Sequence, residues 1–353
     1  MTRPAAALSR GAPPPVPETG LFSLADLPVE TVARLAERTV ELHHDPAAHA
    51  RPLAGAAVGV LFARPSTRTR TAFTVAAVRL GGGPVAYGPG ELQSSTSEFG
   101  ESAEPVEDTG RSLGSMLDGL VARPAGTLDD LRLLSRHGHL PVVNAMTPEE
   151  HPSQGLCDLA TLRLTLGRLD GLRLLYVGEG NATATALALA LSGIPGCEAT
   201  FACPPGYGLP AALLATAGKR AARSGATLTH RDSARSLPTG VDVVYTTRWQ
   251  TTGGSRPDAA WRERFRPFHV DEEFMTRRPG ALFLHDLPAH RGEEVSGAVL
   301  DGPRSVAWTQ ASMKLGCAMA VLEWALGEGN PHGQASVTPA PPDTPAASEA
   351  SEA

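Results

Sequence analysis

The chain has 353 residues, of which 42% are hydrophobic and 19% are charged, and its formal net charge is -6. A protein of this length and composition is expected to fold as about two globular domains, whose cores need no disulfide or structural metal. The acidic balance argues against nucleic acid or an anionic membrane as a general partner.

Strands and helices alternate along the first half of the chain. Residues 1–20 are rich in Pro and Ala without periodicity, and we expect a disordered arm there. The pattern then predicts a helix beginning near Ser23, a buried strand over 56–63, a helix over 66–80 ended by Gly81 to Gly83, a strand over 83–88, a polar loop from Gly90 to Val106, a helix and a strand over 106–123, and a strand over 140–146.

The second half repeats this rhythm and ends in residues 331–353, which we expect to be a disordered tail. The pattern predicts a strand and turn over 172–181, a helix over 183–192, a strand over 197–206, a helix over 211–225, strands over 241–249 and 280–287, and a helix over 311–326. The alternation predicts an α/β fold with two doubly wound domains built on parallel sheets. Ligands of such sheets bind beyond the carboxyl ends of the strands.

The four cysteines are scattered along the chain, without a CxxC pair or a His-Cys cluster at metal spacing: Cys157, Cys197, Cys203 and Cys317. In a chain of this length they predict reduced thiols and a cytoplasmic location. The N-terminal segment lacks the apolar stretch of a signal peptide, and no run approaches the roughly 20 apolar residues of a membrane-spanning helix. We therefore expect no membrane partner.

The segment Ser66-Thr67-Arg68-Thr69-Arg70 follows a predicted buried strand and opens a predicted helix. Free backbone N–H groups at a helix start, the positive end of the helix dipole, two hydroxyls and a guanidinium all favour a phosphate. The alternative is an ordinary Ser/Thr cap on an amphipathic basic helix. The segment lacks GxxxxGK[ST], so it is not a nucleotide P-loop.

Two further segments follow predicted strands. His151-Pro152-Ser153-Gln154 offers an imidazole and an amide, which can both bond a planar carbonyl-amide group. The alternative for His151 is a helix cap or a packed core histidine. The Gly178-Glu179-Gly180 turn resembles the start of the GxGxxG motif of dinucleotide-binding proteins, so a dinucleotide-dependent oxidoreductase is an alternative function. The turn lacks the third glycine of that motif. An absorbance titration with nicotinamide cofactors discriminates that class.

Taken in order, STRTR after a strand, HPSQ with LCDLATL behind it, and LPAHRGEEV near the end resemble the aspartate/ornithine carbamoyltransferase family. The similarity covers residues 22–328. It implies a carbamoyl-phosphate-binding domain over 21–150, completed by a C-terminal helix at 309–328, and an acceptor-binding domain over 151–308. It also implies a homotrimer with active sites at subunit interfaces, and neither a metal nor a cofactor.

The resemblance assigns residues to the donor, carbamoyl phosphate. The residues that match donor-binding positions of the family are Ser66, Thr67, Arg68, Thr69, Arg123, His151, Gln154, Leu287 and Lys314. It implies that Arg123 spans phosphate and carbonyl, while Gln154 and the backbone near Leu287 orient the carbamoyl NH2. The chemistry is consistent, because amine attack creates an oxyanion that fixed donors stabilise, and cations favour the departing phosphate. Lys314 stands where the family usually has an arginine, so it keeps the charge but loses the fork geometry.

The resemblance also assigns the acceptor site, where this sequence departs from the ornithine enzymes. The residues that match acceptor-binding positions of the family are Asn181, Thr247, Arg248, Gln250, Thr251, Thr252 and Asp286. Ala182 and Thr247 replace an asparagine and an aspartate of those enzymes, and Asp286 replaces a cysteine. Arg248 and Gln250 instead resemble the TRxQ of aspartate carbamoyltransferases. The alternatives are that Arg248 pairs with a surface acid and that Asp286 is a structural turn residue.

A loop residue from a neighbouring subunit is also implied. Glu98 aligns with a glutamine that the family offers to the next active site, and Gln93 is the alternative for that position. With Arg68, Arg123, His151 and Asp286 as catalytic candidates, the sequence predicts transfer of a carbamoyl group to an amine of a small amino-acid-like acceptor. We expect a non-ornithine diamino acid in a specialised, antibiotic-type pathway. The alternatives are an ornithine carbamoyltransferase and a non-catalytic relative that binds phosphate ligands.

Overall fold

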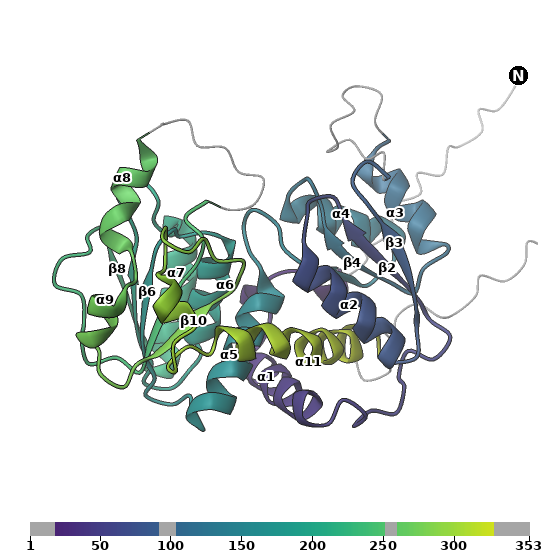
Figure 1. The fold of residues 1–353 in the computed structure, drawn as a ribbon. Helices are drawn as coiled ribbons and strands as arrows, with labels where there is room; N and C mark the ends of the chain where they lie inside the picture. The colour runs from purple at the N-terminus through teal and green to yellow at the C-terminus, as the bar shows by residue number, and fades with distance from the viewer. Residues whose placement is uncertain (1–17, 92–103, 251–259, 328–353) are drawn as a thin grey trace, which may run out of the picture.

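The computed structural model describes residues 18–91, 104–250 and 260–327. Within them, two five-stranded sheets lie side by side, and helices cover their faces (Figure 1). Every strand pairing in both sheets is parallel. The predicted α/β fold with two doubly wound domains is therefore confirmed.

The first sheet has the strand order β1-β5-β4-β2-β3. Its strands are β1 (Gly20–Leu21), β2 (Ala57–Phe62), β3 (Gly83–Tyr87), β4 (Gly119–Arg123) and β5 (Val142–Asn144). The helices of this half are α1 (Val29–His44), α2 (Thr67–Arg79), α3 (Val106–Gly114), α4 (Leu128–Gly138) and α11 (Ala307–Leu326), with a 3-10 turn at Leu24–Asp26. The C-terminal helix α11 packs against α1 and α2, so it returns to the first half.

The second sheet has the order β10-β9-β6-β7-β8. Its strands are β6 (Arg173–Val177), β7 (Glu198–Ala202), β8 (Thr227–Arg231), β9 (Val243–Thr246) and β10 (Leu282–His285). The helices are α5 (Pro152–Leu166), α6 (Ala182–Leu191), α7 (Ala211–Ser224), α8 (Trp261–Phe265), α9 (Glu272–Thr276) and α10 (Gly297–Leu300), with a 3-10 turn at Arg266–Phe268.

The strand orders place a switch point in each sheet. In the first, the chain moves outward from β2 to β3, then returns to the other side of β2 with β4. In the second, β9 lies on the opposite side of β6 from β7. Segments that leave neighbouring strands in opposite directions open a crevice at the carboxyl ends of the strands. Both crevices face the space between the two halves.

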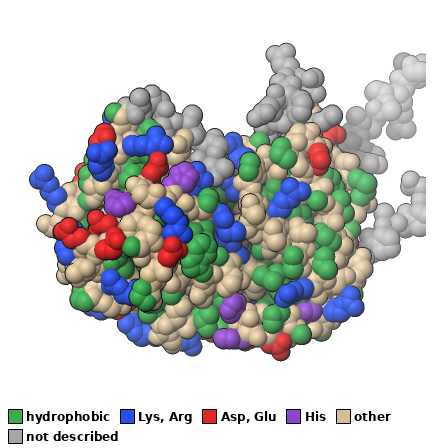
Figure 2. Space-filling model, in the orientation of Figure 1, with side chains coloured by type: hydrophobic (Ala, Val, Ile, Leu, Met, Phe, Trp, Pro, Cys, Tyr) green, Lys and Arg blue, Asp and Glu red, His purple; other side chains and the backbone are tan. Residues whose placement is uncertain are grey.

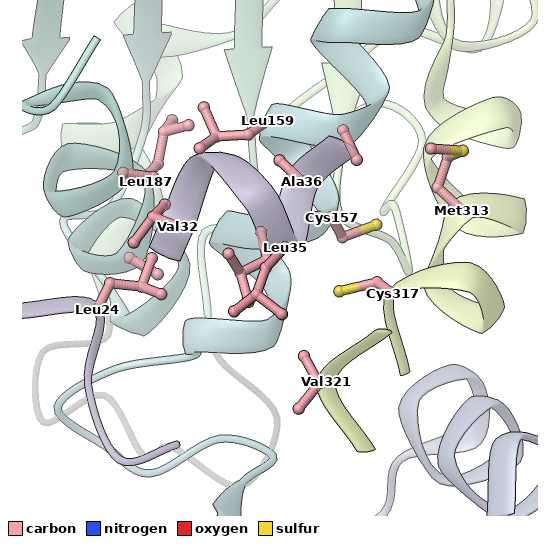
Figure 3. Close-up of a cluster of buried hydrophobic side chains, with 14 of the residues drawn as sticks. Leu24, Val32, Leu35, Ala36, Cys157, Leu159, Leu187, Met313, Cys317 and Val321 are labelled. Carbon is pink, nitrogen blue, oxygen red and sulfur yellow. The ribbon is translucent and has the colours of Figure 1, made fainter. Parts of the chain in front are cut away.

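A continuous apolar core joins the two halves. Helix α5 packs against α1 and α11 on one side and against α6 on the other. Figure 3 shows the shared cluster, which contains Leu24, Val32, Leu35, Ala36, Cys157, Leu159, Leu187, Met313, Cys317 and Val321. Each labelled residue is at most 4% exposed, so the cluster is a packed interior that fixes α5, and with it the residues at its start.

Several predicted boundaries need correction. The arm predicted over 1–20 is too long, because Gly20 pairs with Val142 in the sheet and the Glu18 carboxylate bonds Arg132 and Arg136. Residues 1–17 and the predicted tail at 331–353 lie outside the described residues. The last helix covers 307–326, not 309–328 or 311–326.

The sequence prediction missed β1, α4, β8 and the short helices α8, α9 and α10. Helix α4 had a local signal, since Thr127 and Asp130 form a capping box at its start. The edge strand β8 has none, because its residues TLTHR are at least partly exposed and show no apolar period. In the described part of the chain, every helix is too short or too polar to cross a membrane.

Candidate active site

A cavity lies where the two crevices meet, at the carboxyl ends of both sheets. Its lining residues in the described chain are Pro65, Ser66, Thr67, Arg68, Thr69, Arg123, Met146, His151, Gln154, Asn181, Thr183, Thr247, Arg248, Asp286, Leu287, Pro288 and Lys314. Four of these are cationic and one is anionic. Figure 2 shows basic side chains where the two halves of the molecule meet. The cavity therefore favours an anion, although the chain as a whole carries a net charge of -6.

The start of helix α2 forms one wall of the cavity. Ser66 is its N-cap residue, with extended backbone (φ -158°, ψ 93°), and its side chain caps no backbone N–H. Donors in the first turn are thus available to a bound anion, and the helix dipole adds to the attraction. The side chains of Thr67, Arg68 and Thr69 line the cavity beside them. This wall suits a phosphate group.

Arg68 lies at the phosphate end of the cavity and interacts electrostatically with two residues of the acceptor end, Arg248 and Asp286. Burial is the main cause that lowers its pKa, and the charge of Arg248 acts in the same direction. The carboxylate of Asp286 opposes both effects. Arg68 is therefore close to both charged residues that the sequence assigned to the acceptor, so donor and acceptor positions adjoin.

Two buried donors complete the anion site. Arg123 ends strand β4 and is 8% exposed, and His151 is the N-cap residue of α5 and is 5% exposed. Burial, together with the charge of Arg64, lowers the pKa of Arg123 to about 10, so its guanidinium is still charged at neutral pH. Burial, with Lys314 and Arg123 nearby, holds the pKa of His151 well below 6.5. The imidazole is neutral, so it can donate one N–H to a carbonyl oxygen.

Gln154 is held between two polar side chains, the carboxyl of Asp158 and the ammonium of Lys314. Its Nε2 donates to Asp158 Oδ1 over 2.7 Å, and its Oε1 accepts from the Lys314 ammonium. These partners fix which end of the amide is the acceptor. Asp158 also accepts from Gln310 Nε2 (2.7 Å) and from the Tyr245 hydroxyl (3.0 Å). This network joins α5, β9 and α11, and Lys314 contacts it through the amide oxygen of Gln154 while also lining the cavity.

Two segments that border the cavity have strained backbone, one after β10 and one after β5. The backbone N–H of Leu287 donates to His285 Nδ1 over 2.8 Å, so the proton of this ring is on Nε2, which donates to Glu294 Oε1 over 3.2 Å. Leu287 adopts φ 55° and Met146 adopts φ 136°, both unusual for residues other than glycine. Both residues line the cavity. Strain of this kind persists where the surroundings enforce it, which is typical of functional sites.

The acceptor end of the cavity contains one acid among its described lining residues. Asp286 follows β10, its side chain is 18% exposed, and its Oδ2 accepts a hydrogen bond from Thr183 Oγ1 over 2.8 Å. Its charge also acts on Arg123, where it opposes the fall in pKa. A carboxylate beside an anion-binding site can attract an ammonium group to the same place.

Asn181 and Thr247 are bonded to each other and to the fold. Asn181 Oδ1 caps α6 by accepting from the backbone N–H of Thr183 and Ala184, and its Nδ2 donates to Thr247 Oγ1 over 3.0 Å. The Thr247 hydroxyl also lies 2.8 Å from the Tyr176 hydroxyl. Both residues line the cavity, but these bonds use most of their polar capacity.

The structure brings together most of the predicted site. All nine predicted donor residues line the cavity, and so do Asn181, Thr247, Arg248 and Asp286. Gln250 is described but is absent from the lining. Thr251, Thr252, Gln93 and Glu98 lie outside the described residues. Sequence reasoning did not identify Met146 or Thr183, because neither belongs to a recognised motif and their contacts depend on the tertiary fold.

The Gly178-Glu179-Gly180 turn has a packing explanation. A Cβ on Gly180 would lie 2.5 Å from the backbone of Gly208 and Leu209. The glycine is therefore required because another loop packs against it, and the backbone of that loop fills the space beside it. This accounts for the turn without a dinucleotide phosphate.

Two family models match the chain. The model described as aspartate/ornithine carbamoyltransferase, carbamoyl-P binding domain, matches residues 20–164. The model described as aspartate/ornithine carbamoyltransferase, Asp/Orn binding domain, matches residues 170–325. Together they cover both sheets and every described residue that lines the cavity.

Named relatives agree with the family models. Ornithine carbamoyltransferase from Acidothermus cellulolyticus is 41% identical over 279 residues, which is 78% of this chain and 87% of the relative. The solved structure of ornithine carbamoyltransferase from Pyrococcus furiosus has a TM-score of 0.80 and 32% identity, covering 87% of this chain and 97% of that one. The catalytic subunit of M. jannaschii aspartate transcarbamoylase has a TM-score of 0.71 and 27% identity, covering 86% and 97%.

Proposed function

The chain belongs to the aspartate/ornithine carbamoyltransferase family, and on that premise we propose that it transfers the carbamoyl group of carbamoyl phosphate to an amine of a small amino acid. One observation carries the proposal: an uncapped helix start, two arginines and a neutral histidine line the same cavity. The domain that binds the donor then covers residues 21–150 with the last helix, and the domain that binds the acceptor covers residues 151–308. His151 and Gln154 lie just past this boundary and serve the donor, in keeping with the carbamoyl-P binding model, which extends to residue 164.

The donor roles follow from the geometry of the cavity. The phosphate binds at the start of α2, on the side chains of Ser66, Thr67, Arg68 and Thr69. The carbamoyl oxygen accepts from Arg123 and His151, and Gln154 Oε1 accepts from the carbamoyl NH2. Lys314 contributes charge near the donor and holds the amide of Gln154.

The reaction balances without any other co-reactant. The amine nitrogen forms a bond to the carbamoyl carbon, and the bond from that carbon to the phosphate oxygen breaks. The leaving phosphate takes the electron pair, while Asp286 accepts the proton that the amine releases. Arg123 and His151 stabilise the oxyanion that forms between these steps, and Arg68 favours departure of the phosphate. The products are a ureido compound and inorganic phosphate.

The acceptor has two candidates. The relatives are named ornithine carbamoyltransferases, so ornithine is the acceptor that the comparisons favour. A shorter diamino acid, such as 2,3-diaminopropionate, is favoured by two features of the described cavity. Asn181 and Thr247 bond each other, and Asp286 is the one acid in the lining, so it is the group that can attract the amine. Asp286 and Arg248 both act on the pKa of Arg68. An amine at Asp286 and a carboxylate at Arg248 would therefore both lie near Arg68, which suits an acceptor with a short spacing between the two groups. The specialised pathway stays a prediction.

We expect the purified protein to form a ureido product and inorganic phosphate from carbamoyl phosphate and one of these amines. The test is a panel of ornithine, 2,4-diaminobutyrate, 2,3-diaminopropionate and aspartate, compared by kcat/KM. A clear preference for ornithine selects the first candidate, and a preference for a shorter diamine selects the second. No turnover with any amine in the panel, while carbamoyl phosphate binds in calorimetry, would favour the non-catalytic alternative.

We also propose that the active protein is a homotrimer, with the loop from Gly90 to Val106 reaching a neighbouring site. Support comes from family membership, since residues 92–103 of this loop lie outside the described chain. Mixing Arg68→Ala subunits with loop-deleted subunits is expected to restore activity, because about a quarter of the sites then combine an intact cavity with an intact loop. Activity is measured after the two proteins are dissociated and reassembled together. A fully active monomer in solution scattering contradicts the proposal.

A further inference from the structure

Thr183 is a cavity residue that none of the family motifs singles out. It lies in the first turn of helix α6, where its backbone N–H donates to Asn181 Oδ1 over 3.0 Å. It is 2% exposed, and its hydroxyl points to Asp286 rather than to its own helix. Its Oγ1 donates to Asp286 Oδ2 over 2.8 Å, which joins α6 to the segment after β10.

This hydroxyl is the one hydrogen-bond donor to the Asp286 carboxylate within the described chain. His285 Nδ1 lies 3.6 Å from Asp286 Oδ1, but it already accepts a hydrogen bond from the N–H of Leu287 and carries no proton to donate. The His285 ring is fixed in that state because its Nε2 faces Glu294. Within the described residues, Thr183 therefore restrains Oδ2, and Oδ1 has no donor.

The carboxylate needs this restraint because cations surround it. Its charge acts on both Arg68 and Arg123, so both guanidiniums attract it. These same two cations line the wall that suits phosphate, and a carboxylate drawn onto them would occupy the donor position. A bond from a buried threonine on a different element selects one position of the carboxylate out of several that the cations would allow.

We propose that Thr183 is a positioning and specificity-determining residue, which holds Asp286 so that Oδ1 receives the attacking amine of the acceptor. The inference rests on the proposed function and extends it. Because the hydroxyl holds Oδ2 in place, Oδ1 is the oxygen without a donor from the described chain, and it is the one that receives the ammonium group. The acceptor class is thus a primary amine that approaches Asp286 end-on, with its own carboxylate held elsewhere, next to Arg248.

The test compares three variants with the wild type. Thr183→Val keeps the shape and removes the hydroxyl, and Thr183→Ser restores it without the methyl group. Thr185→Val is the matched control, since Thr185 is a buried threonine of the same helix that does not line the cavity. We expect Thr183→Val to lower kcat/KM for the acceptor about tenfold or more, as a lost bond to a charged group predicts. The Ser and Thr185 variants stay within about threefold of wild type.

Calorimetry and thermal unfolding separate this role from a structural one. The Tm of Thr183→Val is expected to match the wild type. Its affinity for carbamoyl phosphate is expected to fall less than its kcat/KM for the acceptor, since the released carboxylate competes with the donor for Arg68 and Arg123. If Thr183→Val leaves acceptor kinetics unchanged while the wild type is active, Thr183 has no such role and the proposed function stands. Equal losses in donor affinity and acceptor kinetics, or no rescue by serine, also overturn the inference. A wild type that carbamoylates no amine overturns the proposed function and, with it, this inference.

Discussion

Replacing Arg68 with alanine is expected to weaken binding of carbamoyl phosphate by at least about 30-fold, which is about 2 kcal/mol. Arg68 is half-buried beside the uncapped start of α2, and burial is the main influence on its pKa. A charge-assisted bond in such a place is worth more than one on the surface, because water screens it less. Calorimetry with carbamoyl phosphate measures the change directly.

Two companion variants make the result specific. Arg68→Lys keeps the charge but cannot form two parallel bonds to a phosphate, so its affinity should lie between wild type and alanine. Arg70→Ala removes a charge from the same helix turn at a position that does not line the cavity, and its affinity should match the wild type. Equal losses for Arg68→Ala and Arg70→Ala would mean that the net positive charge of the helix, and not a bound phosphate at Arg68, determines affinity.

Most of the donor half of this site could be predicted from the sequence, because six of its nine residues belong to two local motifs. Ser66 to Thr69 form a single helix start, and His151 to Gln154 form another. Each motif follows a strand, and parallel sheets bring such positions to one edge. The strand register places Arg123 beside them. Phe62 pairs with Arg123, so the end of β4 lies beside the end of β2, just before the first motif.

The acceptor half depends on contacts between segments far apart in the chain. Thr183 and Asp286 are 103 positions apart, and Gln310 reaches Asp158 across 152 positions. No local pattern marks a threonine in an Ala-rich helix as the partner of a distant carboxylate. The bond from Asn181 Nδ2 to Thr247 Oγ1 was likewise hidden, because these two residues are 66 positions apart.

Removing the charge of Asp286 is expected to lower turnover strongly, whereas removing Arg68 is expected to act mainly on donor affinity. A free alkylamine with a pKa near 10.4 is almost wholly protonated at neutral pH, so it must lose a proton before it attacks. Asp286 is the one acid that lines the described cavity, and its carboxylate lies close enough to Arg68 and Arg123 to act on their pKa values. Asp286→Asn keeps the shape and removes both the attraction for the ammonium and the proton acceptor, so kcat should fall about 100-fold or more.

Donor affinity gives the decisive contrast. The Asp286→Asn variant has no negative charge at this position near the phosphate site, so calorimetry should show carbamoyl phosphate binding as tightly as in wild type, or more tightly. Arg248→Ala should raise the acceptor KM with a smaller effect on kcat, because Arg248 is assigned to the acceptor carboxylate and not to the proton. Near-full turnover by Asp286→Asn with the preferred acceptor would remove Asp286 from the mechanism and return the proton to the leaving phosphate, the other base that the reaction itself provides.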